Sequence, residues 1–95
     1  MSLQFEWDPR KAKANFAKHG VSFEEAMTVF ADPLARIFND ETHSMGQKRE
    51  IIIGHSKERR LLLVSFTGPA DRIRVISARV TTRREQKDYE ENLSS

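Results

Sequence analysis

Apolar and polar positions follow two different periods along this chain, and the change between them separates an N-terminal part from a C-terminal part. Near the N-terminus, Phe5 and Trp7 alternate with polar residues, which predicts a short half-buried strand. Asp8 and Pro9 then offer a side-chain cap followed by a proline suited to a first helical turn. We therefore expect a helix here, ending at Gly20, a residue that readily takes the left-handed conformation.

A second helix is predicted directly after the first. Ser22 and Glu25 have the spacing of a capping box, and apolar residues recur at three and four positions across 23–31. Pro33 closes this helical pair. The aromatic and large apolar residues of the N-terminal part are expected to fill the core: Trp7, Phe16, Phe23, Met27 and Phe30.

Beyond Pro33 the period changes from about 3.6 to 2, the spacing of strands. Short polar breaks separate the segments, so sequential strands should pair as an antiparallel meander. Thr82 and Glu85 repeat the capping-box spacing and open a last helix that runs to about Asn92. We predict one α+β domain over 1–95, with helices on one face of a curved sheet. Its four predicted meander strands are Leu34–Phe38, Glu50–Gly54, Arg60–Phe66 and Arg72–Val80.

Charge is distributed unevenly along the chain although the formal net charge is only +2. Residues 43–87 carry eleven Lys or Arg against four Asp or Glu, whereas residues 1–42 carry five against seven. A basic block of this size suggests a polyanionic partner, RNA or DNA, although on charge alone a merely solvated face is an equal alternative. The chain has no cysteine, no long apolar stretch and no signal-peptide pattern, so we expect a cytoplasmic protein without disulfides or membrane association.

Several short sequence motifs occur in a fixed order along these predicted elements. They are Phe5-Glu6-Trp7-Asp8-Pro9, Lys18-His19-Gly20-Val21-Ser22-Phe23-Glu24-Glu25-Ala26, Val29-Phe30-Ala31-Asp32-Pro33, Ile53-Gly54, Ile73-Arg74-Val75-Ile76-Ser77-Ala78-Arg79 and Thr82-Arg83-Arg84-Glu85. In order and spacing, from Phe5 to about Glu90, the chain closely resembles the BrnT family of bacterial toxins. The resemblance implies a RelE-like fold and an endoribonuclease that halts translation.

The resemblance also implies a partner and leaves alternatives open. The partner is a BrnA-like ribbon-helix-helix antitoxin, which would supply all contacts to operator DNA. Since ribbon-helix-helix proteins dimerise, we expect a heterotetramer of two toxins and two antitoxins. The antitoxin is expected to bury the basic face, dock on the last helix or pair with a sheet edge. Two other functions stay open: a ParE-like gyrase poison, and an inactive corepressor that only binds the antitoxin.

Metal-independent RNA cleavage needs a proton acceptor for the 2′-hydroxyl, a proton donor for the leaving oxygen, and cations for the extra phosphorane charge. We predict Arg79, Arg49 and His43 as catalytic residues, and we expect Arg49, Arg79 and Arg83 to converge on one hollow. Arg79 has a structural alternative, an ion pair with Glu85 or Asp88. No cofactor and no metal site are predicted, because the three histidines lack ligand spacing. The predicted RNA-binding residues are Arg83, Arg84, Tyr89, His55 and Lys48.

Overall fold

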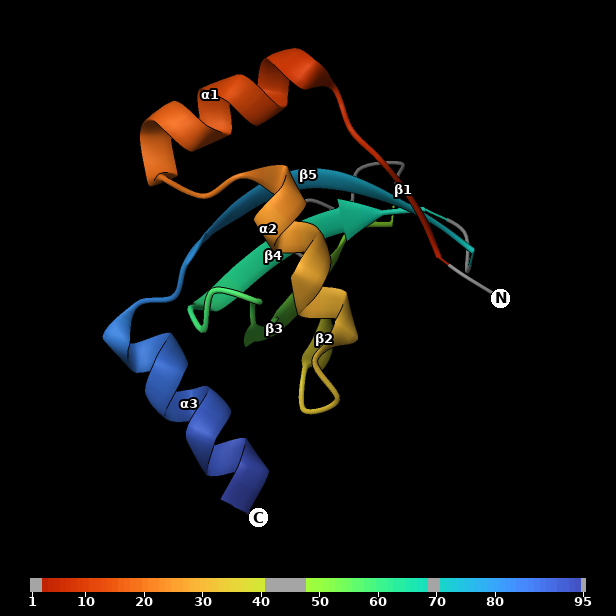
Figure 1. The fold of residues 1–95 in the computed structure, drawn as a ribbon. Helices are drawn as coiled ribbons and strands as arrows, with labels where there is room; N and C mark the ends of the chain where they lie inside the picture. Colours follow the sequence, from red (N-terminus) through yellow and green to blue (C-terminus); the bar gives the residue numbers. More distant parts are fainter. Residues whose placement is uncertain (1–2, 41–47, 69–70, 95) are drawn as a thin grey trace.

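A five-stranded sheet forms the centre of the molecule, with strand order β1-β5-β4-β3-β2 (Figure 1). The structure is a computed structural model, and it describes residues 3–40, 48–68 and 71–94. β2, β3, β4 and β5 pair antiparallel in sequence order, while β1 lies parallel to β5 at the opposite edge from β2. The elements are β1 (Gln4–Glu6), α1 (Pro9–His19), α2 (Phe23–Thr28), the 3-10 turn η1 (Val29–Ala31), β2 (Arg36–Asn39), β3 (Glu50–His55), β4 (Leu61–Thr67), β5 (Arg72–Val80) and α3 (Arg83–Ser94).

The predicted α+β order of elements is confirmed, with three differences. Helix α3 packs on the sheet face opposite α1 and α2, so the prediction that the helices share one face is wrong. β2 begins two residues later than expected, because the Asp32 side chain accepts a hydrogen bond from the Leu34 backbone N–H and holds 32–34 in a turn. The second predicted helix is built as α2 followed by the single 3-10 turn η1. The parallel pairing of β1 with β5 is a long-range contact that local sequence patterns do not predict.

The helix ends follow the predicted capping residues. The Asp8 carboxylate accepts a hydrogen bond from the Arg10 backbone N–H, and Gly20 ends α1 in the left-handed region at φ 69°. The Ser22 hydroxyl accepts from the Glu25 N–H at the start of α2. Thr82 and Glu85 form a complete capping box, in which each side chain accepts a hydrogen bond from the other's backbone N–H.

The core lies between the sheet and the helices α1 and α2. Its fully buried side chains include Phe23 of α2, Leu62 and Val64 of β4, and Val75 of β5. Trp7 and Phe30 pack against this core, as expected. The prediction for Phe16 is wrong: its side chain is 57% exposed, because α1 turns the neighbouring Asn15 toward the sheet instead.

Candidate functional site

The sheet has a second face, opposite α1 and α2, which we call the open face. Side chains alternate along each strand, so the neighbours of the core residues point to this side. Many of them are half-buried, whereas His55 is exposed. The open-face residues of the three central strands include Ile51, Ile53 and His55 of β3, Leu63 and Ser65 of β4, and Ser77 and Arg79 of β5.

One row of paired residues crosses the open face from β2 to β5. Arg36 pairs with Ile53, Ile53 with Leu63, and Leu63 with Arg79. We call these four residues the cross-strand row. Three interstrand steps separate its two arginines, so their Cα atoms lie about 14 Å apart. The row therefore carries a cation at each end and apolar side chains between them.

Helix α3 is attached to both ends of the cross-strand row. The Arg79 guanidinium donates to both carboxylate oxygens of Glu85, each at 2.8 Å, and the Arg36 guanidinium donates to the Asn92 carbonyl oxygen at 3.0 Å. Between these contacts, the Tyr89 hydroxyl donates to the Leu34 carbonyl oxygen at 3.1 Å. α3 thus runs from the end of β5 toward β2 and stands away from α1 and α2 (Figure 1).

The Arg79–Glu85 pair is the strongest charge interaction at this site. Hydrogen bonds from the Arg79 guanidinium and from the Thr82 backbone N–H lower the pKa of Glu85 to about 2, although burial acts in the opposite direction. The same hydrogen bond raises the pKa of Arg79 further above its ordinary value. Both groups stay charged through the physiological range, so the ion pair named as the alternative for Arg79 does form.

His55 lies beside α3 at the end of β3. Its ring packs edge-on against Tyr89 with centroids 5.9 Å apart, and its side chain is 53% exposed. The His55 backbone N–H donates to the Asp32 carboxylate at 2.7 Å, and Nδ1 lies 3.8 Å from the same oxygen. The imidazole is therefore held by its neighbours while one side of it remains open to solvent.

Tyr89 occupies a different environment from the one predicted for base stacking. The residue is only 3% exposed, and its hydroxyl is engaged with Leu34. Burial and the negative charge of Asp32 raise the pKa of Tyr89. In this conformation the ring serves as an anchor of α3 and offers no face to a base.

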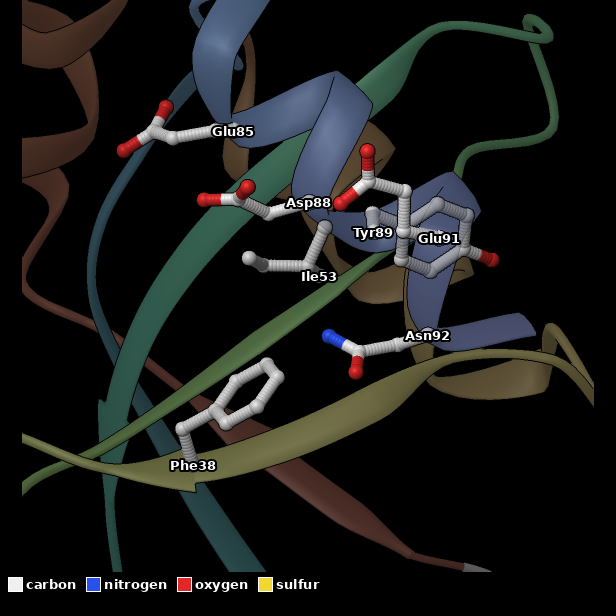
Figure 2. Close-up of a pocket in the computed structure, with 7 residues that line it drawn as sticks. All are labelled: Phe38, Ile53, Glu85, Asp88, Tyr89, Glu91 and Asn92. Carbon is white, nitrogen blue, oxygen red and sulfur yellow. The ribbon is translucent and has the colours of Figure 1, made fainter. Parts of the chain in front are cut away.

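A pocket of about 490 Å³ lies between α3 and the open face. Figure 2 shows carboxylates of α3 above the apolar side chains of Ile53 and Phe38. The hollow beside Arg79 is therefore acidic on one wall and apolar on the other, not basic throughout. Its lining residues are Phe38, Ile53, Glu85, Asp88, Tyr89, Glu91 and Asn92.

The predicted convergence of Arg49, Arg79 and Arg83 on one hollow is wrong. Arg49 precedes β3 on the open face, but the strand register places it level with the start of β5. It lies about 13 Å along the strands and two strands across from Arg79, so their Cα atoms are about 16 Å apart. Arg83 precedes Glu85 by two residues, which is about 200° around the helix, so it points away from the sheet. Strand register sets the positions of Arg49 and Arg79, and helix rotation sets that of Arg83. The residues next to each arginine in the sequence do not show these positions.

The remaining predicted residues are spread over the surface. Lys48 is exposed next to Arg49, and Arg84 is exposed in the first turn of α3. At the end of the sheet where Arg49 lies, Arg72 and Arg74 form ion pairs with Glu6 of β1 at 3.7 and 3.0 Å. His43 lies outside the described residues. The open face therefore has basic residues at both ends.

Sequence reasoning missed two residues that shape the site. Arg36 was assigned only to a strand, although a charged residue alternating with apolar neighbours is a sign of an exposed position. Asp32 was treated as part of a helix-ending word, whereas its carboxylate joins the turn before β2 to the backbone of His55. The alternation around Arg36 indicates exposure, but its place opposite Arg79 and the contact of Asp32 with His55 depend on strand pairing, which the sequence does not reveal.

The described residues offer no candidate metal site and no candidate membrane span. No group of three or more His, Asp or Glu side chains in 3–40, 48–68 and 71–94 is arranged to hold a metal ion. No helix in the part of the chain that the structure describes is long and apolar enough to cross a membrane.

Comparison with known proteins relates both the sequence and the fold to one group. Residues 7–85 match the family model described as the ribonuclease toxin BrnT of type II toxin–antitoxin systems. The fold is similar to the crystal structure of the Brucella abortus ribonuclease toxin BrnT, with a TM-score of 0.65 and 24% identity over 86% of this chain and 100% of that chain. Comparison with curated protein sequences finds no match. The family match includes Arg79 and ends at Glu85.

Proposed function

This chain belongs to the BrnT family of ribonuclease toxins of type II toxin–antitoxin systems, and from that premise we propose a metal-independent endoribonuclease that binds RNA across its open face. The family description does not support the gyrase-poison and corepressor alternatives. A kinship with RelE-type toxins stays a prediction. The proposal places the scissile phosphate at Arg79 and the flanking backbone toward the basic residues at the other end of the sheet.

The observation that carries this proposal is the geometry of Arg79. Its two terminal nitrogens each contact one oxygen of Glu85 at 2.8 Å. A phosphodiester presents two non-bridging oxygens that suit the same bidentate contact. The Glu85 carboxylate thus occupies the position that a substrate phosphate would take. RNA binding then requires the phosphate to replace Glu85 at Arg79. This exchange is feasible because a guanidinium makes the same bidentate contact with a carboxylate and with a phosphate.

The proposed reaction needs no group from outside the chain and its RNA. The 2′-hydroxyl oxygen attacks the adjacent phosphorus, the P–O5′ bond breaks, and the products are a 2′,3′-cyclic phosphate and a free 5′-hydroxyl. One proton leaves the 2′-hydroxyl and one reaches the 5′-oxygen. We assign proton transfer to His55, with His43 as the second candidate. The register sets the Cα atoms of His55 and Arg79 about 12 Å apart on the open face, a span that two such side chains close around one phosphate.

Basic residues outside this centre are proposed to hold RNA without taking part in the chemistry. Arg49 and Lys48 are suited to the backbone on one side of the scissile bond, and Arg83 and Arg84 to RNA that passes α3. Charged contacts of this kind contribute affinity that falls as salt rises. Their replacement should raise the RNA concentration needed for cleavage more than it lowers the maximal rate.

The family places a protein antitoxin beside the toxin. We propose that this antitoxin is BrnA-like, with a ribbon-helix-helix part that dimerises and alone contacts operator DNA. The complex is then a heterotetramer of two toxins and two antitoxins in the cytoplasm, where RNA is translated. Mass measurement of the co-purified complex tests this proposal, and a one-to-one mass would contradict it.

Purified chain incubated with RNA in the presence of EDTA tests the catalytic proposal. We expect cleavage with cyclic-phosphate ends, and Arg79→Ala should lower the rate by about 10²–10³-fold, the usual cost of removing one donor to a developing oxyanion. Arg10→Ala, which removes an exposed arginine of α1, is the matched control and should cleave normally. Unchanged cleavage by a folded Arg79→Ala variant would refute the assignment of Arg79, and complete dependence on added metal would refute the mechanism.

Glu85→Gln separates the proposed role of Glu85 from that of a general base. The substitution preserves the shape and the capping box but removes the negative charge that competes for Arg79. We expect RNA cleavage to be maintained or accelerated, with tighter RNA binding. A loss of 10²- to 10⁴-fold, the range for a missing acid–base group, would instead make Glu85 the proton acceptor.

A further inference from the structure

We infer that the exposed edge of β2 is a docking surface for an extended segment of the antitoxin, in which apolar residues alternate with Lys or Arg. The inference rests on the protein antitoxin of the proposed function and adds where and how it binds. Three features of the β2 edge carry it: outward-pointing backbone groups, exposed apolar side chains, and a different hollow on each side of the strand.

The backbone of β2 is available along its outer side. β2 is the last strand of the sheet, and no strand lies beyond it among the described residues. The Asp40 N–H donates to the Arg49 carbonyl at 3.0 Å, which marks this pair as hydrogen-bonded. Hydrogen-bonded and non-bonded pairs alternate in an antiparallel ladder, so Ile37 and Asn39 direct their N–H and C=O groups away from β3. These groups form the template that an added strand requires.

Apolar side chains are unusually exposed along this edge. Leu34 is 57% exposed, Ile37 56% and Phe38 43%, and all three lie within five consecutive residues. Natural edge strands are normally protected by charge, proline or a covering element, because an apolar edge invites pairing with another chain. A protein that works in complex with a partner has this protection when the partner is bound.

The side of β2 that faces the helices borders a second hollow, which is lined mainly by apolar side chains together with the carboxylates of Asp32 and Glu50. Ile37 pairs with the buried Ile52, so both point to this side of the sheet. A hollow of about 360 Å³ lies here between η1 and the ends of the strands. Apolar side chains of an added strand that point to this side would cover Ile37 and enter the hollow. Its apolar lining residues are Leu3, Phe30, Ala35, Ile37, Ile52, Phe66 and Ile73.

The other side of β2 borders the acidic pocket shown in Figure 2. Phe38 lies on this side, opposite the carboxylates of Asp88 and Glu91 on α3. These two carboxylates form no ion pair with another residue in the described ranges. An added strand would direct every second side chain into this pocket. A Lys or Arg there would pack its apolar stem against Phe38 and place its charge beside the carboxylates of Asp88 and Glu91.

A second copy of this chain fits the same edge less well. Two β2 strands side by side would offer Arg36 as the basic residue for the partner's acidic pocket. The Arg36 guanidinium already donates to the Asn92 carbonyl within its own chain, so it would have to give up that contact. A partner that brings its own basic side chain avoids this loss, and the charge pattern therefore favours the antitoxin.

Hydrogen exchange of the toxin, free and in complex with the antitoxin encoded beside it, tests the inference directly. We expect the amides of Ile37 and Asn39 to become protected in the complex, because they then donate to the added strand. Equally fast exchange of both amides in the free and bound toxin would overturn the inference. Protection that is already present in the free toxin, together with a dimeric mass, would assign the edge to a second copy.

Matched variants test the side chains and the backbone separately. Ile37→Lys should weaken antitoxin binding by on the order of tenfold or more, whereas Phe16→Lys, equally exposed on α1, should not. Asn39→Pro removes an outward N–H and should weaken binding, whereas Asn39→Ala keeps that donor and should not. Asp88→Asn combined with Glu91→Gln should weaken binding in a salt-dependent way, unlike Glu58→Gln in the β3–β4 turn.

These binding measurements test the docking surface even if the catalytic proposal fails. A chain that cuts no RNA but loses the antitoxin on Ile37→Lys would refute the endoribonuclease and keep the docking surface. A chain that cleaves RNA and binds the antitoxin unchanged in both Ile37→Lys and Asn39→Pro would refute only the docking surface.

Discussion

Asn15 in α1 and Ala78 in β5 exchange two hydrogen bonds across the core. The Asn15 amide nitrogen donates to the Ala78 carbonyl at 2.8 Å, and the Ala78 N–H donates to the Asn15 amide oxygen at 3.1 Å. The same amide nitrogen also donates to the Val21 carbonyl at 3.0 Å. Asn15 thus pairs with β5 as a neighbouring strand would, directly beside Arg79. This contact connects the helix layer to the residue proposed to hold the phosphate.

Asn15→Ala should destabilise the protein by about 2–3 kcal/mol. The substitution leaves buried backbone groups of Ala78 and Val21 without partners, and each such group costs about 1–3 kcal/mol when unmet. Urea unfolding compares the variant with wild type, and Lys13→Ala on the exposed side of α1 is the control. A loss no larger than that of the control would mean that these contacts contribute little to stability.

Glu85 should make the free energy of unfolding depend on pH. A carboxyl whose pKa falls from 4.5 to about 2 on folding stabilises the native state above its unfolded pKa, and this contribution disappears as pH falls from about 4.5 toward 2. Because the Arg79 side chain is 37% exposed, we expect only about 1–2 kcal/mol after solvent screening. Unfolding of wild type and Glu85→Gln at pH 6 and pH 2.5 measures the difference. A gap that stays constant with pH would contradict the pair's contribution.

Gly54→Ala should disturb the junction between β3 and β2. A Cβ at Gly54 would lie 2.8 Å from the Cβ of Ala35 and 3.0 Å from a carboxylate oxygen of Asp32. Such overpacking costs about 1–3 kcal/mol and should displace the turn that holds His55. Gly20→Ala is the contrasting variant, since it meets nothing within 4 Å and pays only for its φ of +69°. Thermal unfolding and RNA cleavage should both decline in Gly54→Ala, whereas Gly20→Ala should lose stability alone.

Tyr89→Phe should affect stability more than catalysis. It removes the hydrogen bond to the Leu34 carbonyl, at a cost of about 1 kcal/mol, and leaves the buried ring in place. We expect cleavage to continue at nearly the wild-type rate, because the hydroxyl is engaged within the protein. A large fall in the rate with unchanged stability would show instead that Tyr89 contacts the RNA.

The elements of this fold were predicted from sequence because their signals are local. Asp8, Ser22 and Thr82 each mark a helix start through a side chain that meets backbone groups two or three residues away. The strands were predicted from alternation, whose period is a property of the extended backbone itself. The candidate site was predicted less well. Arg79 was identified together with its possible partner Glu85, whereas Arg36 was missed and Arg49 was assigned to the wrong end of the sheet.

The sequence by itself determined the helix limits, the order of strands, the uneven charge and the family resemblance, since each depends on residues close together in the chain or on their order. The tertiary structure decided how the cations are arranged, because strand register alone sets Arg36 and Arg79 at the two ends of one row and Arg49 about 13 Å along the strands from that row. It also decided that α3 covers that row and that the β2 edge is exposed. These are contacts between segments distant in sequence, and only the folded chain brings them together.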